Sequence, residues 1–174
     1  GIKNIGIDIN KADVLFGQKK GLRLYHKTIE ELQINEKYDF VIFRRTLEHL
    51  HNPRLSLKKI KAILKDDGLI YISVPSLDSL LYSSDPKKIN IQNQLHFAHI
   101  YFFSKKTLSN LMATCDLKSI FINHHIDSLW VKGKSAVKFH YRSVLITILI
   151  IKYFKYMIIL KNLLFRLIKF NQNM

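Results

Sequence analysis

The adjacent residues Glu48 and His49 are the pair in this sequence best suited to chemistry. A histidine has an intrinsic pKa near neutrality, so His49 could act as a base toward a bound hydroxyl. The structural alternative is that the pair orders the start of a helix that begins at Pro53. We name Glu48 and His49 as candidate catalytic residues and leave both interpretations open.

Two arginines, Arg44 and Arg45, stand just before that pair and directly after an apolar run, residues 40–43. They could bind an anionic acceptor, or they could indicate that the site is no longer used. Cys115 is the single cysteine, and no cysteine and histidine group has the spacing of a zinc site. The sequence therefore predicts no internal disulfide and no metal site.

The elements that must position these residues alternate between strand and helix. Apolar periodicity and capping residues predict strands at 2–9, 22–26, 40–43, 69–74, 117–123 and 129–139, and helices at 11–20, 53–64 and 104–114. Thr28 and Glu31 have capping-box spacing, and Asp67-Gly68 predicts a turn. Residues 76–94 are polar and are expected to be irregular. This order favours an α/β fold with a mostly parallel sheet and helical crossovers.

Two stretches of the chain resemble the class I S-adenosylmethionine-dependent methyltransferases of the small-molecule branch, which have a Rossmann-like fold. The first stretch, residues 38–53, contains Tyr38-Asp39, then Leu47-Glu48-His49-Leu50, then Asn52-Pro53. The second, residues 64–75, has the Lys-x-x-Gly turn into a strand that ends at Pro75. The first is most similar to the ubiquinone-pathway O-methyltransferases, which have an acid where this chain has Arg45.

The resemblance implies S-adenosylmethionine as the cofactor and a set of residues that would bind it. Asp8, in the stretch Gly6-Ile7-Asp8-Ile9-Asn10, takes the place of the family's ribose-binding acid, and Ile9 would border the adenine. Ile29 stands where the family has a segment beside the adenine ring. Phe43 and Arg44 belong to the loop that lines the methionine part of the donor.

The resemblance also implies an acceptor side. Arg45, His96 and His99 stand at positions that border the acceptor pocket in relatives. The Glu48-His49 region is linked to catalysis and metal in the quinone-pathway enzymes, which agrees with its choice as the catalytic pair. A histidine near aromatic residues is more often structural, and that alternative stays open for His96 and His99.

The family's glycine-rich turn has no counterpart here, since no Gly-x-Gly occurs in the sequence. The resemblance covers residues 1–123 and begins where the family's second strand would begin. We therefore expect an N-terminally truncated methyltransferase domain whose sheet lacks its first strand and whose cofactor site is incomplete.

The net charge of +15 is concentrated toward the C-terminus, because no acidic residue follows Asp127. Residues 143–170 are apolar and basic, and predict a helix that lies on a membrane interface or packs on protein. The uncharged run at 143–151 is much shorter than the ~20 residues that span a bilayer. We divide the chain into a partial methyltransferase domain, 1–142, and this segment, 143–174. Codon usage in an AT-rich genome would explain part of the lysine content.

Three functions remain open. The leading hypothesis is a methyltransferase that acts in the cytoplasm on a lipid-linked, quinone-like or sugar acceptor, with a possible peripheral membrane location. The second is an inactive methyltransferase-like remnant that binds a membrane or a partner. Nucleic-acid binding is disfavoured, because the basic residues stand among long apolar side chains rather than in a polar stripe.

Overall fold

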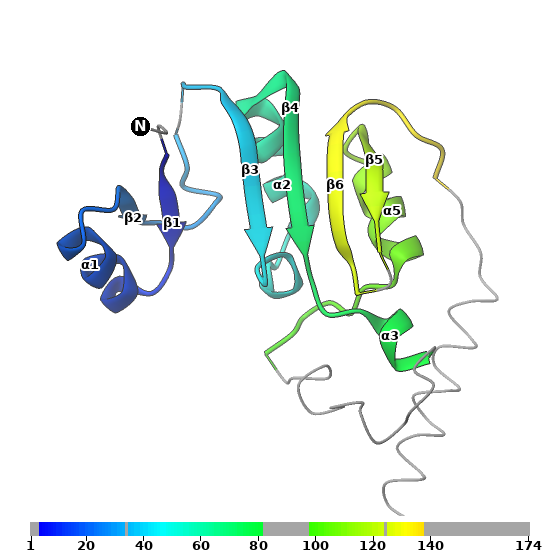
Figure 1. The fold of residues 1–174 in the computed structure, drawn as a ribbon, viewed down its shortest axis with the longest axis horizontal. Helices are drawn as coiled ribbons and strands as arrows, with labels where there is room; N and C mark the ends of the chain where they lie inside the picture. The colour runs from blue at the N-terminus through cyan, green and yellow to red at the C-terminus, as the bar shows by residue number, and fades with distance from the viewer. Residues whose placement is uncertain (1–3, 34, 82–97, 124, 138–174) are drawn as a thin grey trace, which may run out of the picture. The chain divides into compact units, whose positions relative to one another are not determined.

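The structure, a computed structural model, describes residues 4–33, 35–81, 98–123 and 125–137. Within these ranges the strands form a two-stranded sheet, β1-β2, and a four-stranded sheet with the order β3-β4-β6-β5 (Figure 1). Helices connect the parallel strands, so the predicted α/β class is confirmed.

The first sheet is built from a short parallel βαβ element. Strand β1 (Gly6–Asp8) leads through helix α1 (Lys11–Lys19) to strand β2 (Leu24–His26). The side chain of Asn10 caps α1 by accepting a backbone N–H of its first turn at 3.0 Å. Gly21 ends the helical segment with a φ of 81°, a conformation that glycine adopts without steric cost. The helix and its stop agree with the sequence-based prediction.

The second sheet contains a parallel strand pair, as the predicted fold class implies. Strand β3 (Tyr38–Arg44) pairs in parallel with strand β4 (Leu64–Ser73), with Phe40 opposite Leu69 and Phe43 opposite Ile72. The carboxyl ends of both strands therefore lie at the same edge of the sheet. Ligand sites of open α/β sheets lie beyond that edge.

The last two strands differ from the expected parallel arrangement. Strand β5 (Leu117–Ile122) and strand β6 (Asp127–Lys132) form an antiparallel hairpin, and β6 is also antiparallel to β4. The connection between β5 and β6 is too short for a parallel crossover, which needs a dozen or more residues. The four-stranded sheet is therefore mixed rather than mostly parallel.

Strand β4 begins earlier than predicted, because the expected turn at Asp67-Gly68 lies inside the strand. A Cβ atom on Gly68 would come within 2.8 Å of the Leu64 side chain, so glycine is needed there for close packing. The pairing shifts register between Tyr38 and Phe40: β3 advances by two residues, from Tyr38 to Phe40, while β4 advances by five, from Leu64 to Leu69. β4 therefore holds three extra residues at this irregularity. Gly68 thus serves packing within the strand rather than a turn.

Two helices cover the same face of the four-stranded sheet (Figure 1). Helix α2 (Pro53–Ile63) begins with a proline after the N-cap Asn52, and helix α5 (Lys105–Ala113) begins after Ser104 in a capping box with Thr107. Both starts agree with the prediction. A shorter helix, α3 (Leu77–Leu81), occupies part of the region expected to be irregular.

The core lies between this sheet face and the two helices. Its fully buried members from the helices and the sheet include Leu57, Leu108, Met112, Ile70, Ile72 and Trp130.

Thr28 and Glu31 make the predicted capping-box hydrogen bonds. The backbone N–H of Thr28 donates to the Glu31 carboxylate at 2.8 Å, and the backbone N–H of Glu31 donates to the Thr28 hydroxyl oxygen at 3.2 Å. These hydrogen bonds stabilise a turn, and no helix begins at this point.

The expected helix at 143–170 and the domain boundary at residue 142 lie outside the described residues, so both stay predictions. No helix in the described ranges combines the length and the apolar character needed to cross a membrane.

Leu57→Ala should lower the free energy of unfolding by about 2–5 kcal/mol, because Leu57 is fully buried in α2 and its truncation leaves a cavity. Leu55→Ala in the same helix is the matched control, since Leu55 is 43% exposed and should lose under about 1 kcal/mol. Urea unfolding measures both. Equal losses in the two variants would mean that α2 does not pack through the face described.

Acid unfolding should report on Asp127. Hydrogen bonds from the side chains of Ser73, Tyr71 and Asn123 hold the pKa of this carboxyl below its usual value. The stabilisation is fully present above the unfolded pKa of about 3.9 and disappears as the pH falls through the lowered folded value. Asp127→Asn should remove this part of the acid sensitivity. Tyr71→Phe, which deletes one donor, should move the loss of stability to higher pH. Identical acid profiles for the wild type and Asp127→Asn would contradict this assignment.

Candidate functional site

A single 3-10 turn, η1 (Leu47–His49), follows β3 and carries the candidate catalytic pair. Leu47 is fully buried in the core and fixes the turn against the sheet. Glu48 is also buried, with 1% of its side chain exposed, whereas 41% of the His49 side chain is exposed. The two adjacent residues therefore face different surroundings.

Residues 98–101 are held against this turn by backbone hydrogen bonds. The carbonyl oxygen of Glu48 accepts the N–H groups of Ile100 and Tyr101 at 2.9 and 3.1 Å. The Tyr101 hydroxyl donates to the carbonyl oxygen of His51 at 3.2 Å. These contacts bring His99 beside Glu48 although the two residues are far apart in the sequence.

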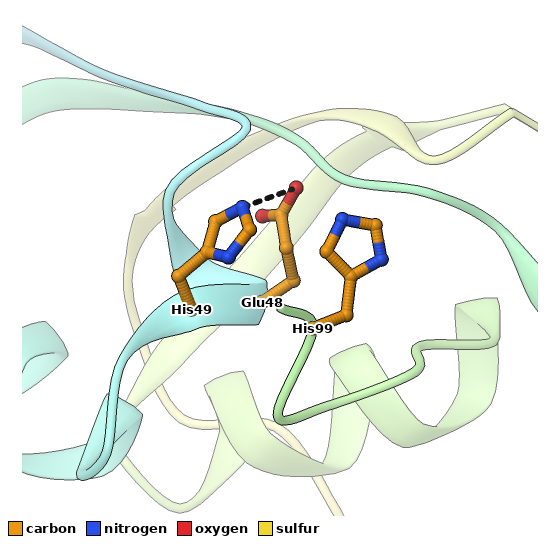
Figure 2. Close-up of side chains that lie close together, drawn as sticks. All are labelled: Glu48, His49 and His99. Atoms are coloured by element: carbon orange, nitrogen blue, oxygen red, sulfur yellow. Dashed lines mark ion pairs between the residues drawn. The ribbon is translucent and has the colours of Figure 1, made fainter. Parts of the chain in front are cut away.

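His49 has one ring nitrogen committed to the backbone. Its Nδ1 lies 3.0 Å from the carbonyl oxygen of Ala98. A carbonyl oxygen can only accept, so we assign the hydrogen to Nδ1, which leaves a lone pair on Nε2 in the neutral ring. The Nε2 atom lies 3.9 Å from Oε1 of Glu48 (Figure 2).

His99 completes a compact group of three side chains. Its ring centroid lies 4.9 Å from that of His49, with 66° between the ring planes. The Glu48 carboxylate lies between the two imidazole rings (Figure 2). One ligand atom from each of the three residues lies within 4.8 Å of the others, so together they could hold a metal ion.

The Glu48 carboxylate is the least satisfied group of this cluster. Neither of its oxygens accepts a hydrogen bond from any residue in the described ranges. A buried polar group without a hydrogen bond costs about 1–3 kcal/mol, and a charged one more. The fold therefore keeps an acid in a place where it opposes stability, which is typical of functional sites.

Arg44, the last residue of β3, and Arg45, which follows it, are both exposed. Arg45 has a φ of 53°, in the left-handed region that costs a residue with a Cβ about 1 kcal/mol or more. Its N–H donates to the carbonyl oxygen of Ser73 at 2.8 Å, and the Thr46 hydroxyl donates to that of Arg44 at 3.1 Å. The loop is therefore fixed by its backbone, and both guanidinium groups are accessible to an anion.

Asp8 ends β1, as the ribose-binding acid was expected to do. Its Oδ1 accepts the N–H of Asn10 at 2.7 Å, which orients the carboxylate at the end of the strand. The next residue, Ile9, is 73% exposed, and its carbonyl oxygen lies 3.0 Å from Nε2 of His26. An oriented carboxylate beside exposed apolar surface fits the ribose and adenine end of a nucleoside. No glycine-rich turn that would hold the other end occurs in the described ranges.

Two of the expected cofactor residues are buried. Ile29 is 6% exposed and Phe43 is 3% exposed, and both belong to the hydrophobic core. Any contact they make with a cofactor would have to come from their backbone or from the edge of the side chain. Their assignment as cofactor residues stays a prediction.

His96 lies outside the described residues, so its assignment to the acceptor side stays a prediction. The sequence pointed to Glu48, His49 and His99 individually, but it did not predict that they meet. No local spacing signals this, because the contact depends on how the loop at 98–101 bonds to η1. The prediction of no metal site rested on cysteine and histidine spacing, which does not detect a Glu-His-His group assembled in this way.

Comparison with known proteins identifies the family. A sequence profile described as a methyltransferase domain matches residues 1–120. An uncharacterized protein of Methanocaldococcus jannaschii is 27% identical over 117 residues, which are 67% of this chain and 56% of that protein. The chain thus spans about half the length of this curated relative.

Solved structures share the fold. An S-adenosylmethionine-dependent methyltransferase from Clostridium acetobutylicum aligns with a TM-score of 0.55 at 12% identity, covering 75% of this chain and 76% of that one. A Burkholderia thailandensis 1,6-didemethyltoxoflavin-N1-methyltransferase, solved with bound 1,6-didemethyltoxoflavin and S-adenosylhomocysteine, aligns with a TM-score of 0.52 at 18% identity. The alignment covers 75% of this chain and 61% of that enzyme.

These structures agree with the Rossmann-like fold that the sequence predicted. Together with the profile, which covers more than half of the chain, they confirm the resemblance seen in the two sequence stretches. The chain belongs to the methyltransferase domain family.

Proposed function

We propose that this chain is the part of an S-adenosylmethionine-dependent methyltransferase that binds the nucleoside end of the donor and the acceptor. The observation that carries the proposal is the oriented Asp8 carboxylate, which ends β1 beside exposed Ile9 in a methyltransferase domain. When bound, the donor supplies a methyl group on a positively charged sulfur, which is already activated for displacement.

The donor side uses hydrogen bonding and apolar contact. The Asp8 carboxylate can accept hydrogen bonds from two ribose hydroxyls, because the acceptor capacity of a carboxylate exceeds its single bond to Asn10. Ile9 offers apolar surface to the adenine ring. Arg44, at the end of β3, belongs to the loop that we expect near the methionine part of the donor.

The acceptor side is built from the loop after β3 and the cluster at η1. We place Arg45, Glu48, His49 and His99 there, with His96 as a further expected contributor. Methyl transfer mainly needs donor and acceptor held in line with water excluded, and a polar cluster near the acceptor can orient it. A guanidinium group at Arg45 would favour an acceptor with a negative charge.

The acceptor class that fits best is a small molecule with a hydroxyl and an anionic group. Lipid-linked, quinone-like and sugar acceptors meet this description where they also carry an anionic group. A lipid-linked acceptor would also suit the basic apolar segment 143–170, for which a membrane interface is one of the two predicted locations and packing on protein is the other. Under this proposal the protein works in the cytoplasm, at or near a membrane.

The alternative is a methyltransferase-like remnant that binds a membrane or a partner and no longer transfers methyl groups. The lack of any Gly-x-Gly in the sequence favours it. The two functions differ in one property that can be measured directly, the binding of the donor product.

Calorimetric titration of the 174-residue chain with S-adenosylhomocysteine tests the proposal. We expect binding with a Kd in the micromolar range, and Asp8→Asn should weaken it by about tenfold or more, since hydrogen bonds to a charged group contribute about 1.5–3 kcal/mol.

Asp13→Asn provides the matched control, because Asp13 is an exposed acid in the first turn of α1. It should leave the affinity within about twofold, a change of under 0.5 kcal/mol that is usual for surface substitutions. Absence of binding to the wild-type chain would reject the proposal for this chain and favour the remnant. Equal weakening by both variants would remove the special role of Asp8.

A further inference from the structure

We propose that the outward side of helix α1 docks on the surface of a bilayer that contains anionic phospholipids. This side, which we term the α1 face, consists of Ala12, Leu15, Phe16 and Lys19, with Leu22 at its end. It is a surface separate from the proposed donor and acceptor sites and from the basic apolar segment at the C-terminus. The docking does not depend on whether the chain transfers methyl groups.

The α1 face is apolar and exposed. Residues three and four apart lie on one side of a helix, so Leu15, Phe16 and Lys19 share a side of α1. Leu15 is 48% exposed and Phe16 is 66% exposed. Single exposed apolar residues are common, but neighbouring large ones rimmed by polar residues are typical of surfaces that contact a protein or a membrane.

The packing of α1 prevents the helix from burying this face against its own sheet. The buried residues of α1 are Val14 and Gly17, which lie on the side opposite to Phe16. A Cβ atom on Gly17 would come within 2.2 Å of the Leu24 side chain, so helix and strand β2 touch at the glycine. Rotation of the helix would bring an aromatic ring to a place where the backbone approach admits only glycine.

Leu22 extends the apolar surface past the end of the helix. Gly21 turns the chain with a φ of 81°, and the N–H of Leu22 donates to the carbonyl oxygen of Gly17 at 3.1 Å. Leu22 therefore lies beside the last turn of α1, and it is 54% exposed. The exposed apolar surface of this segment thus includes three large side chains.

Basic side chains accompany the apolar ones. Residues 11–27 contain one acid, Asp13, and five basic residues, so the segment carries a net positive charge. The basic residues are Lys11, Lys19, Lys20, Arg23 and Lys27, all exposed. The ammonium group of Lys20 lies 5.7 Å from the centroid of the Phe16 ring, which is within the range of a cation–π contact.

This combination of groups matches an anionic bilayer. Interfacial helices place Phe and Leu side chains at the boundary of the acyl chains and leave Lys groups among the headgroups. The position of Lys20 beside Phe16 lets the ring enter the bilayer while the ammonium group stays with the phosphates. Nucleic acid would instead require a basic and polar stripe, in which exposed leucines have no role. Anionic lipid therefore complements both the charge and the apolar surface of the α1 face.

Docking through α1 would also bring the proposed donor site to the membrane. The N-cap of the helix, Asn10, donates its N–H to the carboxylate of Asp8 at 2.7 Å. A docked helix would therefore hold the nucleoside end of the donor near the bilayer, where a lipid-linked acceptor lies. This consequence rests on the proposed function, whereas docking itself does not.

Co-sedimentation of the 174-residue chain with vesicles of phosphatidylcholine and phosphatidylglycerol tests the apolar part of the face. We expect the wild type to bind and Phe16→Gln to lower the partition coefficient by about tenfold, because insertion removes an aromatic side chain from water. Phe121→Gln is the matched control, since Phe121 is 51% exposed on β5, and it should stay within about twofold. Absence of binding by the wild type, or equal weakening by both variants, would overturn the proposal.

The charge of the face gives a second test. Lys19→Gln should weaken binding to the anionic vesicles by about fivefold, the usual contribution of one basic residue near an anionic surface. It should leave binding to vesicles of phosphatidylcholine alone within about twofold. Lys106→Gln, at an exposed position of α5, is the matched control and should change neither by more than about twofold. Equal losses in the two variants would mean that net charge alone attracts the chain, which would overturn docking through α1.

Fluorescence tests whether the side chain at position 16 enters the bilayer. Lipids brominated on their acyl chains should quench the added emission of Phe16→Trp but not that of Phe121→Trp, with the buried Trp130 as a background common to both. Equal quenching would contradict insertion through α1. Self-association of the wild type that Phe16→Gln abolishes, with vesicle binding unchanged in that variant, would assign the face to a second copy of the chain instead.

The vesicle experiments and the titration with S-adenosylhomocysteine separate the two proposals. Vesicle binding that depends on Phe16, without S-adenosylhomocysteine binding, would support docking and reject donor binding by this chain. The reverse result would support donor binding and overturn docking.

Discussion

The parallel pairing of β3 with β4 is the interaction on which the rest of the described structure depends. It places Phe43 beside Ile72 in the buried layer, and α2 and α5 cover that layer on one face. It also brings the carboxyl ends of both strands to one edge, where the Arg45 N–H bonds to the carbonyl oxygen of Ser73. The strained loop and the η1 turn that follow are therefore held by the sheet itself.

The Glu48 cluster shows how this framework supports a site that opposes stability. Leu47 is anchored in the core, so its neighbour Glu48 is carried into a buried position with its carboxylate unbonded within the described ranges. The backbone carbonyl of Glu48 meanwhile holds the loop that presents His99. The same residue thus organises the loop through its backbone and places a buried carboxylate beside two histidines through its side chain.

Donor binding and acceptor binding are assigned to different parts of the chain. Asp8 and Ile9 follow β1 of the two-stranded sheet, whereas the Glu48 cluster follows β3 of the four-stranded sheet. Each assignment rests on local geometry, an oriented carboxylate in one case and a buried Glu-His-His group in the other. Either one can therefore fail without removing the physical basis of the other.

The sequence by itself determined the element types, most helix starts and the family, because these depend on local patterns. Pro53 after Asn52 and the Ser104 cap specify helices through bonds to nearby backbone. The apolar run at 40–43 specifies a strand, but not a buried one, since Phe40 and Ile42 are 48% and 62% exposed in the described structure. Only the tertiary structure decided that β6 runs antiparallel, that Gly68 lies inside a strand, and that Ile29 and Phe43 are in the core. The tertiary structure alone brought His99 to Glu48 and His49, because backbone hydrogen bonds between η1 and residues 100–101 make that contact. Such long-range bonds cannot be predicted from the local periodicity of the sequence.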